Sequence, residues 1–309
     1  MSKTAVVFAG QGAQFVGMGK DLVSAYPVCR TLFAEADDVL GYALSKLCFE
    51  GPQEELTKSN HCQPAIFVTS MACYRVLEEQ VPDLAPVAMA GLSLGEWSAL
   101  HAAGVLTFAD TLRILQVRGT AMQAACEEQP GGMVSVMGLG RSELEALCGE
   151  AGVEMANLNS EEQTVLSGPK AGIEKAALLA TERGAKRAIV LDVAGAFHSS
   201  LMRSAVDKLQ AVLADVVISA PAVPVVSNVT GALHGDPDAI REAMLRQVTE
   251  SVHWYEGVAA MTGAGADTFV ECGPGKVLSG LLKRIARGAR LLQVQDDASL
   301  TTTVTALKG

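Results

Sequence analysis

The sequence predicts an α/β protein in which a small unit is inserted into a larger one. Two short apolar strands, at Thr4–Phe8 and at Val87–Ala90, are each followed by a glycine-containing turn and then by a helical pattern. A β-α-β-β-α-β succession interrupts this arrangement in the middle of the chain. With 309 residues, of which 49% are hydrophobic, the chain can bury a large core in two parts. We therefore expect a large subdomain built on a parallel sheet and a separate two-layer sandwich.

The composition disfavours several classes of function and location. The formal charge of −10 and a pI near 5.0 argue against a nucleic-acid-binding protein, because phosphate binding requires a basic surface. Mean hydropathy is high at +0.27, but no apolar run approaches the length of about 20 residues that a membrane span needs. Seven scattered cysteines without a C-x-x-C pair argue against zinc and favour a reducing compartment. Because no secretory leader precedes the first strand, we expect a soluble cytoplasmic protein.

The first strand runs into the loop Ala9–Gln14, which presents backbone groups. Its Gly10-x-Gly12 pair does not form a dinucleotide site, because Phe15 stands where the third glycine belongs, and no phosphate-loop lysine follows. A residue between two glycines can aim its peptide N–H at a reacting centre, so Gln11 is a candidate for half of an oxyanion hole.

Two long helical regions precede the second strand. Apolar residues recur at helical spacing from Asp21 to Leu47, and Gly51-Pro52 ends that region. Pro64–Gln80 is predicted to be a second helix with apolar residues on almost every side, which is typical of a helix buried inside a large domain.

The second strand ends in Gly91-Leu92-Ser93-Leu94-Gly95, and good helix formers follow. This Gly-x-Ser-x-Gly pattern between a strand and a helix is that of a nucleophile elbow, so the large subdomain is predicted to be α/β-hydrolase-like. Side chains at Gly91 or Gly95 would clash with neighbouring backbone. The turn would push the Ser93 hydroxyl outward, with the Leu94 N–H facing the reacting centre. The flanking elements favour a nucleophilic serine over the alternative, an ordinary loop serine.

Thr107 is predicted to cap a helix that runs to about Cys126, with Asp110 completing the capping pattern. Arg118 lies on this helix between apolar neighbours. A charge on such a surface reaches water or needs an anionic partner. The spacing alone leaves a structural ion pair and a ligand-binding role both open.

The inserted unit is predicted from six successive elements. Its strands and helices are expected, in chain order, at Met133–Leu139, Ser142–Ala151, Val153–Leu158, Gln163–Ser167, Ala171–Arg183 and Arg187–Val193. This β-α-β-β-α-β order matches the ferredoxin-like sandwich. We therefore expect a small subdomain at 129–196 and a large one formed by 1–128 and 197–309.

A nucleophilic serine needs a base whose pKa lies near neutrality, and histidine is the natural candidate. The chain has five histidines. His198 stands at the predicted junction of the two subdomains, where a side chain can face a cleft, so it is the candidate base. The alternative for His198 is a structural, hydrogen-bonded histidine. The other four have no special setting in the sequence: His61, His101, His234 in a Gly/Asp/Pro turn, and His253.

Ordered sequence blocks along nearly the whole chain carry a family resemblance. The blocks are Phe8-Ala9-Gly10-Gln11-Gly12-Ala13-Gln14, Gln63-Pro64-Ala65, Gly91-Leu92-Ser93-Leu94-Gly95-Glu96, Arg118-Gly119, Asn159 with Gln163, Ala196-Phe197-His198, Ser227-Asn228-Val229-Thr230-Gly231 and Glu271-Cys272-Gly273-Pro274-Gly275. In these blocks the chain resembles the malonyl-CoA:acyl-carrier-protein transacylases of fatty-acid synthesis, which are related to the acyltransferase domains of polyketide synthases.

The resemblance implies a role for each matching site residue. Ser93 would be the acylated nucleophile and His198 its base, with the backbone N–H groups of Gln11 and Leu94 as the oxyanion hole. Arg118 would bind the free carboxylate of malonate, which a guanidinium fork fits with two parallel hydrogen bonds.

The resemblance also bears on three positions around these residues. Gln247 matches the position whose backbone carbonyl orients the histidine, so no triad acid is expected. Phe197 matches the position associated in polyketide acyltransferases with the choice of malonyl over branched acyl groups. Leu92 departs from the histidine that most relatives carry beside the serine, a change that leaves the nucleophile intact and alters the contacts of the pocket.

The activity implied is ping-pong transfer of malonyl from malonyl-CoA to the phosphopantetheine thiol of acyl carrier protein, through a malonyl-serine ester. No metal or redox cofactor is expected, and we expect a monomer. The alternatives are a serine hydrolase or thioesterase on acyl-CoA, which would not need Arg118, a trans-acting polyketide acyltransferase, and a module that binds the carrier without turnover.

Carrier proteins are acidic, so an acidic transferase needs a local basic surface to bind them. The candidates follow the Gly273-Pro274-Gly275 turn. They are Lys276, Lys283, Arg287 and Arg290, predicted to fall close to one helical face, with Arg284 beside them. The alternative is a solvated helix face without a partner.

Overall fold

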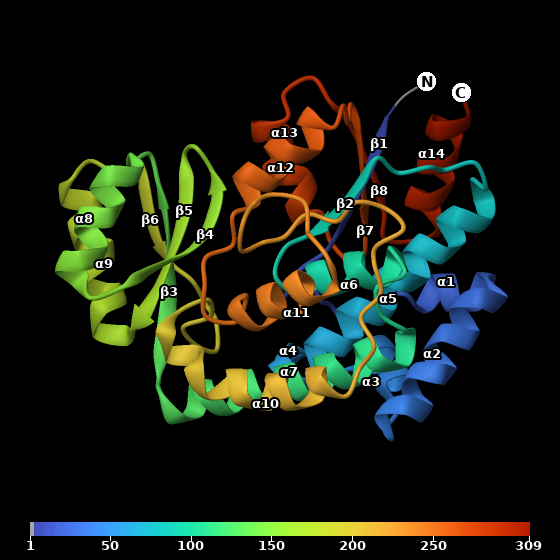
Figure 1. Cartoon of the computed structure of the whole chain (residues 1–309), viewed down its shortest axis with the longest axis horizontal. Coiled ribbons are helices and arrows are strands. Elements are labelled where there is room, and N and C mark those ends of the chain that lie inside the picture. Colours follow the sequence, from blue (N-terminus) through green and yellow to red (C-terminus); the bar gives the residue numbers. More distant parts are fainter. Residues whose placement is uncertain (1–2) are drawn as a thin grey trace.

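A four-stranded parallel sheet forms the centre of the large subdomain (Figure 1). Its order is β2-β1-β7-β8, formed by β2 (Ala88–Gly91), β1 (Thr4–Phe8), β7 (Thr268–Cys272) and β8 (Arg290–Val294). Every neighbouring pair is parallel. The computed structural model describes residues 3–309, so Met1 and Ser2, with which the predicted large subdomain begins, lie outside the described residues.

The two faces of this sheet lie against separate apolar cores. Successive side chains of a strand point to opposite faces, and β1 follows this rule. Val6 and Phe8 belong to the larger core, whereas Ala5 and Val7 belong to the second one. Because both faces are covered, all five residues of β1 are buried, as expected for the interior of a parallel sheet.

The region from Asp21 to Leu47 forms separate short helices rather than one continuous helical stretch. Pro27 begins a new helix after the extended Tyr26, and Gly41, with φ of 73°, ends it. The helices of this region are α1 (Lys20–Ala25), α2 (Pro27–Leu40) and α3 (Leu44–Glu50), and α4 (Gln53–Thr57) follows Gly51-Pro52.

Helix α5 (Ser59–Gln80) is the buried helix predicted at Pro64–Gln80, but its predicted start was wrong. The helix begins five residues earlier and contains Pro64 within it. An interior proline costs about 3 kcal/mol in lost hydrogen bonding and steric clash. The side chains from Cys62 to Tyr74 are all buried, and this packing offsets the cost.

Helix α6 (Leu94–Ala102) follows β2 directly, and α7 (Phe108–Glu128) comes next. The predicted cap of α7 is confirmed, because the Thr107 hydroxyl accepts the Asp110 N–H at 3.1 Å. The helix continues two residues beyond Cys126.

The inserted unit is ferredoxin-like, as predicted. Its elements are β3 (Gly131–Met137), α8 (Arg141–Ala151), β4 (Glu154–Ser160), β5 (Gln163–Pro169), α9 (Lys170–Glu182) and β6 (Arg187–Val190). The four strands form an antiparallel sheet in the order β4-β5-β3-β6, and α8 and α9 cover one face around a separate core (Figure 1). The exact boundaries at 129 and 196 stay a prediction.

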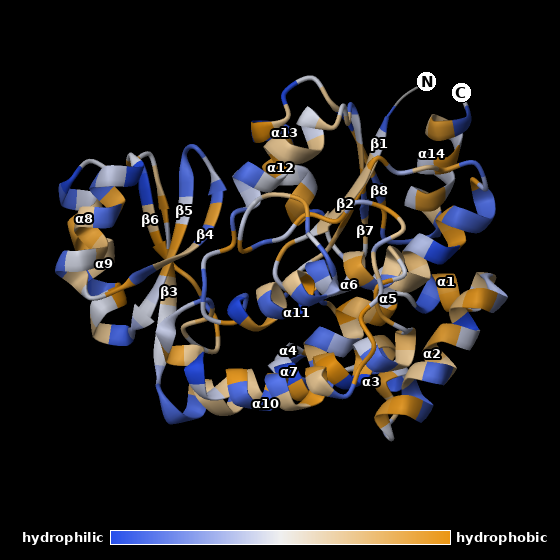
Figure 2. Ribbon diagram, in the orientation of Figure 1, coloured by the Kyte–Doolittle hydropathy of each residue, from blue (hydrophilic) through white to orange (hydrophobic). Residues whose placement is uncertain are grey.

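The chain then returns to the large subdomain. The elements are the 3₁₀ turn η1 (Ser200–Met202), α10 (Arg203–Ala214), α11 (Pro237–Arg246), α12 (Trp254–Gly263), α13 (Val277–Ile285) and α14 (Asp297–Lys308). Outer helices such as α2 and α10 alternate hydrophilic and hydrophobic residues along their length (Figure 2), as helices with one face on a core do. None of the helices described between residues 3 and 309 is long and apolar enough to cross a membrane.

The prediction that four basic residues share one helical face was wrong. Helix α13 ends at Ile285, so Arg287 lies beyond it and Arg290 begins β8. Lys276 is the N-cap residue of α13, and Lys283 lies in its last turn. All four side chains are nevertheless exposed, together with Arg284.

Candidate active site

The strand, turn and helix around Ser93 have the geometry of a nucleophile elbow. Ser93 is the N-cap of α6, and its φ of 53° is a strained value for a residue with a side chain. A Cβ on Gly91 would lie 2.0 Å from the Gly95 carbonyl carbon, and a Cβ on Gly95 would lie 2.2 Å from the Phe8 oxygen. Both positions therefore require glycine, as predicted, and the turn holds the serine hydroxyl at the end of the strand.

His198 lies beside Ser93 and is oriented by backbone carbonyls. Its Nε2 is 2.8 Å from Ser93 Oγ, and its Nδ1 is 2.9 Å from the Gln247 carbonyl oxygen and 3.2 Å from that of Glu250. Because a carbonyl only accepts, Nδ1 carries the hydrogen and Nε2 presents its lone pair to the serine hydroxyl. This arrangement holds a serine and a base in contact without a carboxylate partner.

Arg118 lies in the same site with only 1% of its surface exposed. Its Nη1 donates to Gln63 Oε1 at 2.7 Å, and its Nη2 donates to Ser93 Oγ and to Gln247 Oε1, both at 3.1 Å. Its Nε is buried and has no hydrogen-bond partner among residues 3–309. Among the residues that the structure describes, the guanidinium therefore donates hydrogen bonds to neutral oxygens only, so an anion placed beside Ser93 would be the first charged group hydrogen-bonded to it.

Burial and charge tune the proton affinities of these two side chains. Burial, together with the charge of Arg118, lowers the pKa of His198 to about 4, while its hydrogen bonds to the two carbonyls act in the opposite sense. Burial lowers the pKa of Arg118 to about 10, and the charge of Glu96 opposes that shift. At neutral pH the imidazole is therefore neutral and able to accept a proton, while the guanidinium remains a cation.

The two predicted oxyanion-hole residues border the elbow. A Cβ on Gly10 would lie 2.6 Å from the Leu92 carbonyl oxygen, so the loop that carries Gln11 passes directly against the turn. Leu94 is the first residue of α6, where an N–H has no partner within the helix. The use of these two N–H groups in stabilising an oxyanion stays a prediction.

Two side chains without a sequence-derived role hold the site together. The Asn228 side chain accepts the Ser93 N–H at 2.6 Å and donates to the Gly91 carbonyl at 2.8 Å, so it links the start of the elbow to Ser93. Gln63 donates to Gln11 Oε1 at 3.3 Å while its own oxygen accepts from Arg118. Both lie in the sequence blocks that carry the family resemblance, which was the only signal pointing to them.

The expectation that His234 has no special setting was wrong. Its Nε2 lies 2.7 Å from Oε1 of the fully buried Glu96, and the exposed fraction of the His234 side chain is 2%. Nothing in a Gly/Asp/Pro turn indicates a partner 138 residues away. Phe197, by contrast, is buried as part of the larger apolar core, next to His198 in the chain.

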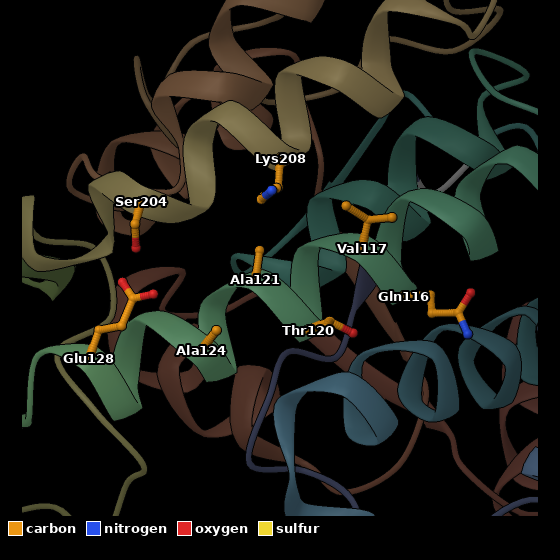
Figure 3. A pocket seen from close by; sticks show the side chains of 8 residues that line it. All are labelled: Gln116, Val117, Thr120, Ala121, Ala124, Glu128, Ser204 and Lys208. Atoms are coloured by element: carbon orange, nitrogen blue, oxygen red, sulfur yellow. The ribbon is translucent and has the colours of Figure 1, made fainter.

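A separate cavity of about 440 Å³ lies between α7 and α10 (Figure 3). It is lined by Ser204 and Lys208 of α10 and by six residues of α7, and none of the lining residues belongs to the Ser93 site. Within the described range 3–309, no three His, Cys, Asp or Glu residues are grouped so as to hold a metal ion.

A comparison with known protein families identifies the family of this chain. The sequence profile of the acyl transferase domain matches residues 5–305. The chain belongs to the acyl transferase family. This match spans both subdomains, so the inserted ferredoxin-like unit is part of the acyl transferase architecture.

Similar proteins extend the comparison to particular acyl transferases. The malonyl CoA-acyl carrier protein transacylase of Haemophilus influenzae is 43% identical over 303 residues, which is 97% of each chain. The crystal structure of an acyl carrier protein S-malonyltransferase from Vibrio cholerae is 41% identical, with a TM-score of 0.94, and the match covers 98% of this chain and 100% of that one. A malonyl-transacylase in complex with a type II PKS acyl-carrier protein is 42% identical, with a TM-score of 0.94 over 99% of this chain and 100% of that one.

Proposed function

We propose that this chain transfers the malonyl group from malonyl-CoA to the phosphopantetheine thiol of acyl carrier protein, as a step of fatty-acid biosynthesis. One observation carries the proposal: a buried guanidinium, hydrogen-bonded within residues 3–309 to neutral oxygens only, lies 3.1 Å from the hydroxyl of a serine in an acyl transferase. A cation at that place suits an acyl group that ends in a carboxylate. The names of two similar proteins, a malonyl CoA-acyl carrier protein transacylase and an acyl carrier protein S-malonyltransferase, support the same substrate.

The first half-reaction acylates Ser93. His198 Nε2 takes the hydroxyl proton as Oγ attacks the thioester carbonyl, and the developing oxyanion is stabilised by the N–H groups of Gln11 and Leu94. The carbon–sulfur bond then breaks, and the imidazolium returns its proton to the thiolate of coenzyme A. A malonyl-serine ester remains, with its free carboxylate bound by Arg118.

The second half-reaction reverses these steps on a different thiol. His198 deprotonates the phosphopantetheine thiol of the carrier, the thiolate attacks the ester, and the serine oxygen recovers the proton from the imidazolium. The same base and the same oxyanion hole therefore serve both half-reactions of this ping-pong mechanism. No metal or redox cofactor takes part in this proposal.

A serine hydrolase or thioesterase is less well supported. Such an enzyme would use Ser93 and His198 but would have no use for a buried cation beside them. The relatives are named transacylases, and one solved structure of a relative contains an acyl-carrier protein.

The proposed role of Phe197 is to limit the acyl group to malonyl. Its buried aromatic ring lies next to the base in the chain and would crowd a substituent on the α-carbon. One methyl group changes selectivity by only about 1–3 kcal/mol, so Phe197 would reduce transfer of methylmalonyl rather than abolish it.

The proposal is tested by the mass of the intact protein after mixing with malonyl-CoA. Wild-type protein is expected to gain one malonyl group, whereas Ser93→Ala gains none. Addition of carrier protein bearing its phosphopantetheine arm is expected to discharge the adduct and to increase the mass of the carrier by the same amount. An adduct that decays equally fast without the carrier would indicate a hydrolase, and no adduct would indicate a different acyl donor.

We also propose that the exposed basic residues around α13 bind the acidic carrier. Reversing the charge with Lys283→Glu and Arg287→Glu should raise the Michaelis constant for the carrier, because the new carboxylates would repel its acidic side chains, and should leave that for malonyl-CoA unchanged. Lys276 and Arg284 would contribute in the same way. The matched control is Lys20→Glu with Lys46→Glu, two exposed lysines on α1 and α3. Equal effects of both double variants on the carrier would contradict docking at this surface.

We further propose that the enzyme is a monomer and that it works in the cytoplasm. Its seven cysteines are all unpaired and buried, which suits a reducing compartment. Sedimentation of the purified protein and fractionation of the cells that produce it would test the two statements.

A further inference from the structure

Glu96 is a buried carboxylate that no step of the proposed transfer uses. It lies on α6, three residues after Ser93, with no exposed surface. Its Oε1 accepts from His234 Nε2 at 2.7 Å, and its Oε2 accepts from Gln247 Nε2 at 2.5 Å. Because an unpaired buried carboxylate is costly, both contacts stabilise it where it lies.

The side-chain amide of Gln247 connects this carboxylate to Arg118. Its nitrogen donates to Glu96 Oε2 and to the Ser93 carbonyl at 2.9 Å, and its oxygen accepts from Arg118 Nη2 at 3.1 Å. An amide rotated by 180° would direct its N–H groups at the guanidinium, which can only donate. By accepting from the amide nitrogen of Gln247, the Glu96 carboxylate therefore keeps the amide oxygen directed at Arg118.

His234 holds the second oxygen of this carboxylate from a separate segment. Its own backbone N–H donates to the Val225 carbonyl at 2.8 Å. The preceding turn includes Gly231, whose φ of 65° and close approach to Glu256 exclude a side chain at that position. The anchored turn fixes the imidazole of His234, so each oxygen of the Glu96 carboxylate has a donor at a fixed position.

We propose that His234 and Glu96 form a positioning pair that determines specificity for acyl groups ending in a carboxylate. By fixing the amide of Gln247, the pair keeps the guanidinium of Arg118 aimed beside Ser93, and it acts on the substrate only through these two residues. This inference rests on the proposed malonyl transfer. The base depends on a different part of Gln247, its main-chain carbonyl, so a defect in the amide alone affects binding of the carboxylate and spares the base.

The test compares His234→Phe, which keeps a ring but removes the donor, with His234→Gln, which restores an N–H donor. Acylation of the enzyme by malonyl-CoA and by acetyl-CoA is followed by the mass of the intact protein over time. His234→Phe is expected to lower the ratio of kcat/KM for malonyl over acetyl about tenfold, mainly through a higher KM for malonyl-CoA. His234→Gln is expected to restore most of the ratio, a rescue that a purely structural role would not produce.

Two further variants keep the test decisive. Glu96→Gln replaces one acceptor oxygen with a donor and is expected to lower the same ratio even if His234→Phe folds poorly. His61→Phe is the matched control, because His61 also faces a glutamate, Glu55, at 3.8 Å, and no hydrogen bond or ion pair within residues 3–309 joins it to Arg118 or Gln247. It is expected to leave the ratio unchanged.

Three results would overturn the inference. Equal losses for malonyl and acetyl would show that the pair supports Ser93 or the fold rather than Arg118. An unchanged ratio in both His234→Phe and Glu96→Gln, with a wild type that prefers malonyl, would remove the pair alone and leave the proposed function standing. A wild type that forms no malonyl-enzyme would overturn the proposed function and this inference with it.

Discussion

Replacement of His198 by alanine is expected to slow formation of the malonyl-enzyme by about 10²–10⁴-fold, the usual contribution of a positioned general base. The imidazole is the group within 2.8 Å of Ser93 Oγ that can accept its proton, since Arg118 at 3.1 Å only donates. Burial and the charge of Arg118 lower the pKa of His198 to about 4, so the base is already neutral at pH 7. Rapid-quench mass spectrometry at saturating malonyl-CoA measures this rate.

Two controls separate the loss of a base from the loss of the fold. The thermal unfolding of His198→Ala shows whether the variant is folded, and added imidazole, which can occupy the vacated space, should restore part of the rate. A His198→Ala protein that acylates Ser93 at the wild-type rate would contradict the assignment of His198 as the base.

Local patterns in the sequence were sufficient to predict the parts of the fold that are determined by contacts between residues close together in the chain. The elbow could be predicted because Gly91 and Gly95 are required by backbone contacts within the turn and with β1. Thr107 could be predicted as a cap because its partner, Asp110, is three residues away. The inserted unit followed from the order of its strands and helices, which determines the sheet order β4-β5-β3-β6.

The errors in the fold arose where tertiary packing decided the outcome. Proline is normally a start signal for a helix, yet α5 continues through Pro64 because the surrounding side chains are buried. Helical spacing of basic residues continues past Ile285, but the chain leaves the helix there to reach β8, which pairs with β7. The spacing of basic residues in the sequence carries no information about this strand pairing.

The site shows the same division between local and long-range information. Ser93 and His198 could be proposed from their settings, and the family resemblance was needed to assign Arg118. The side-chain contacts that order them join distant segments: Asn228 is 135 residues from Ser93, and Gln247 is 151 residues from Glu96. No spacing rule predicts such pairs, because they exist only after α6 and the segments after β6 have packed together.

Replacement of Arg118 by alanine is expected to have the largest effect on substrate choice. Loss of one partner from a buried charge pair typically costs about 2–5 kcal/mol, so kcat/KM for malonyl-CoA should fall at least about 30-fold more than that for acetyl-CoA, which carries no carboxylate. The measurement is the acylation rate of Ser93 with each thioester. Arg113→Ala is the matched control on the same helix, since Arg113 is exposed and pairs with Asp110 at 3.0 Å, and its effect should be less than about twofold for either substrate.

The same variant is expected to shift the pH dependence of the reaction. The positive charge of Arg118 is one of the two influences that lower the pKa of His198, so its removal should raise that pKa from about 4 toward the ordinary value of 6.5. Since the base must be neutral to accept the serine proton, the acid limb of acetyl-enzyme formation should move to higher pH in Arg118→Ala. Equal losses for malonyl and acetyl, with an unmoved acid limb, would contradict the placement of a charged arginine at the reacting centre. A selective loss together with a raised limb would support one cation acting on both the substrate carboxylate and the base.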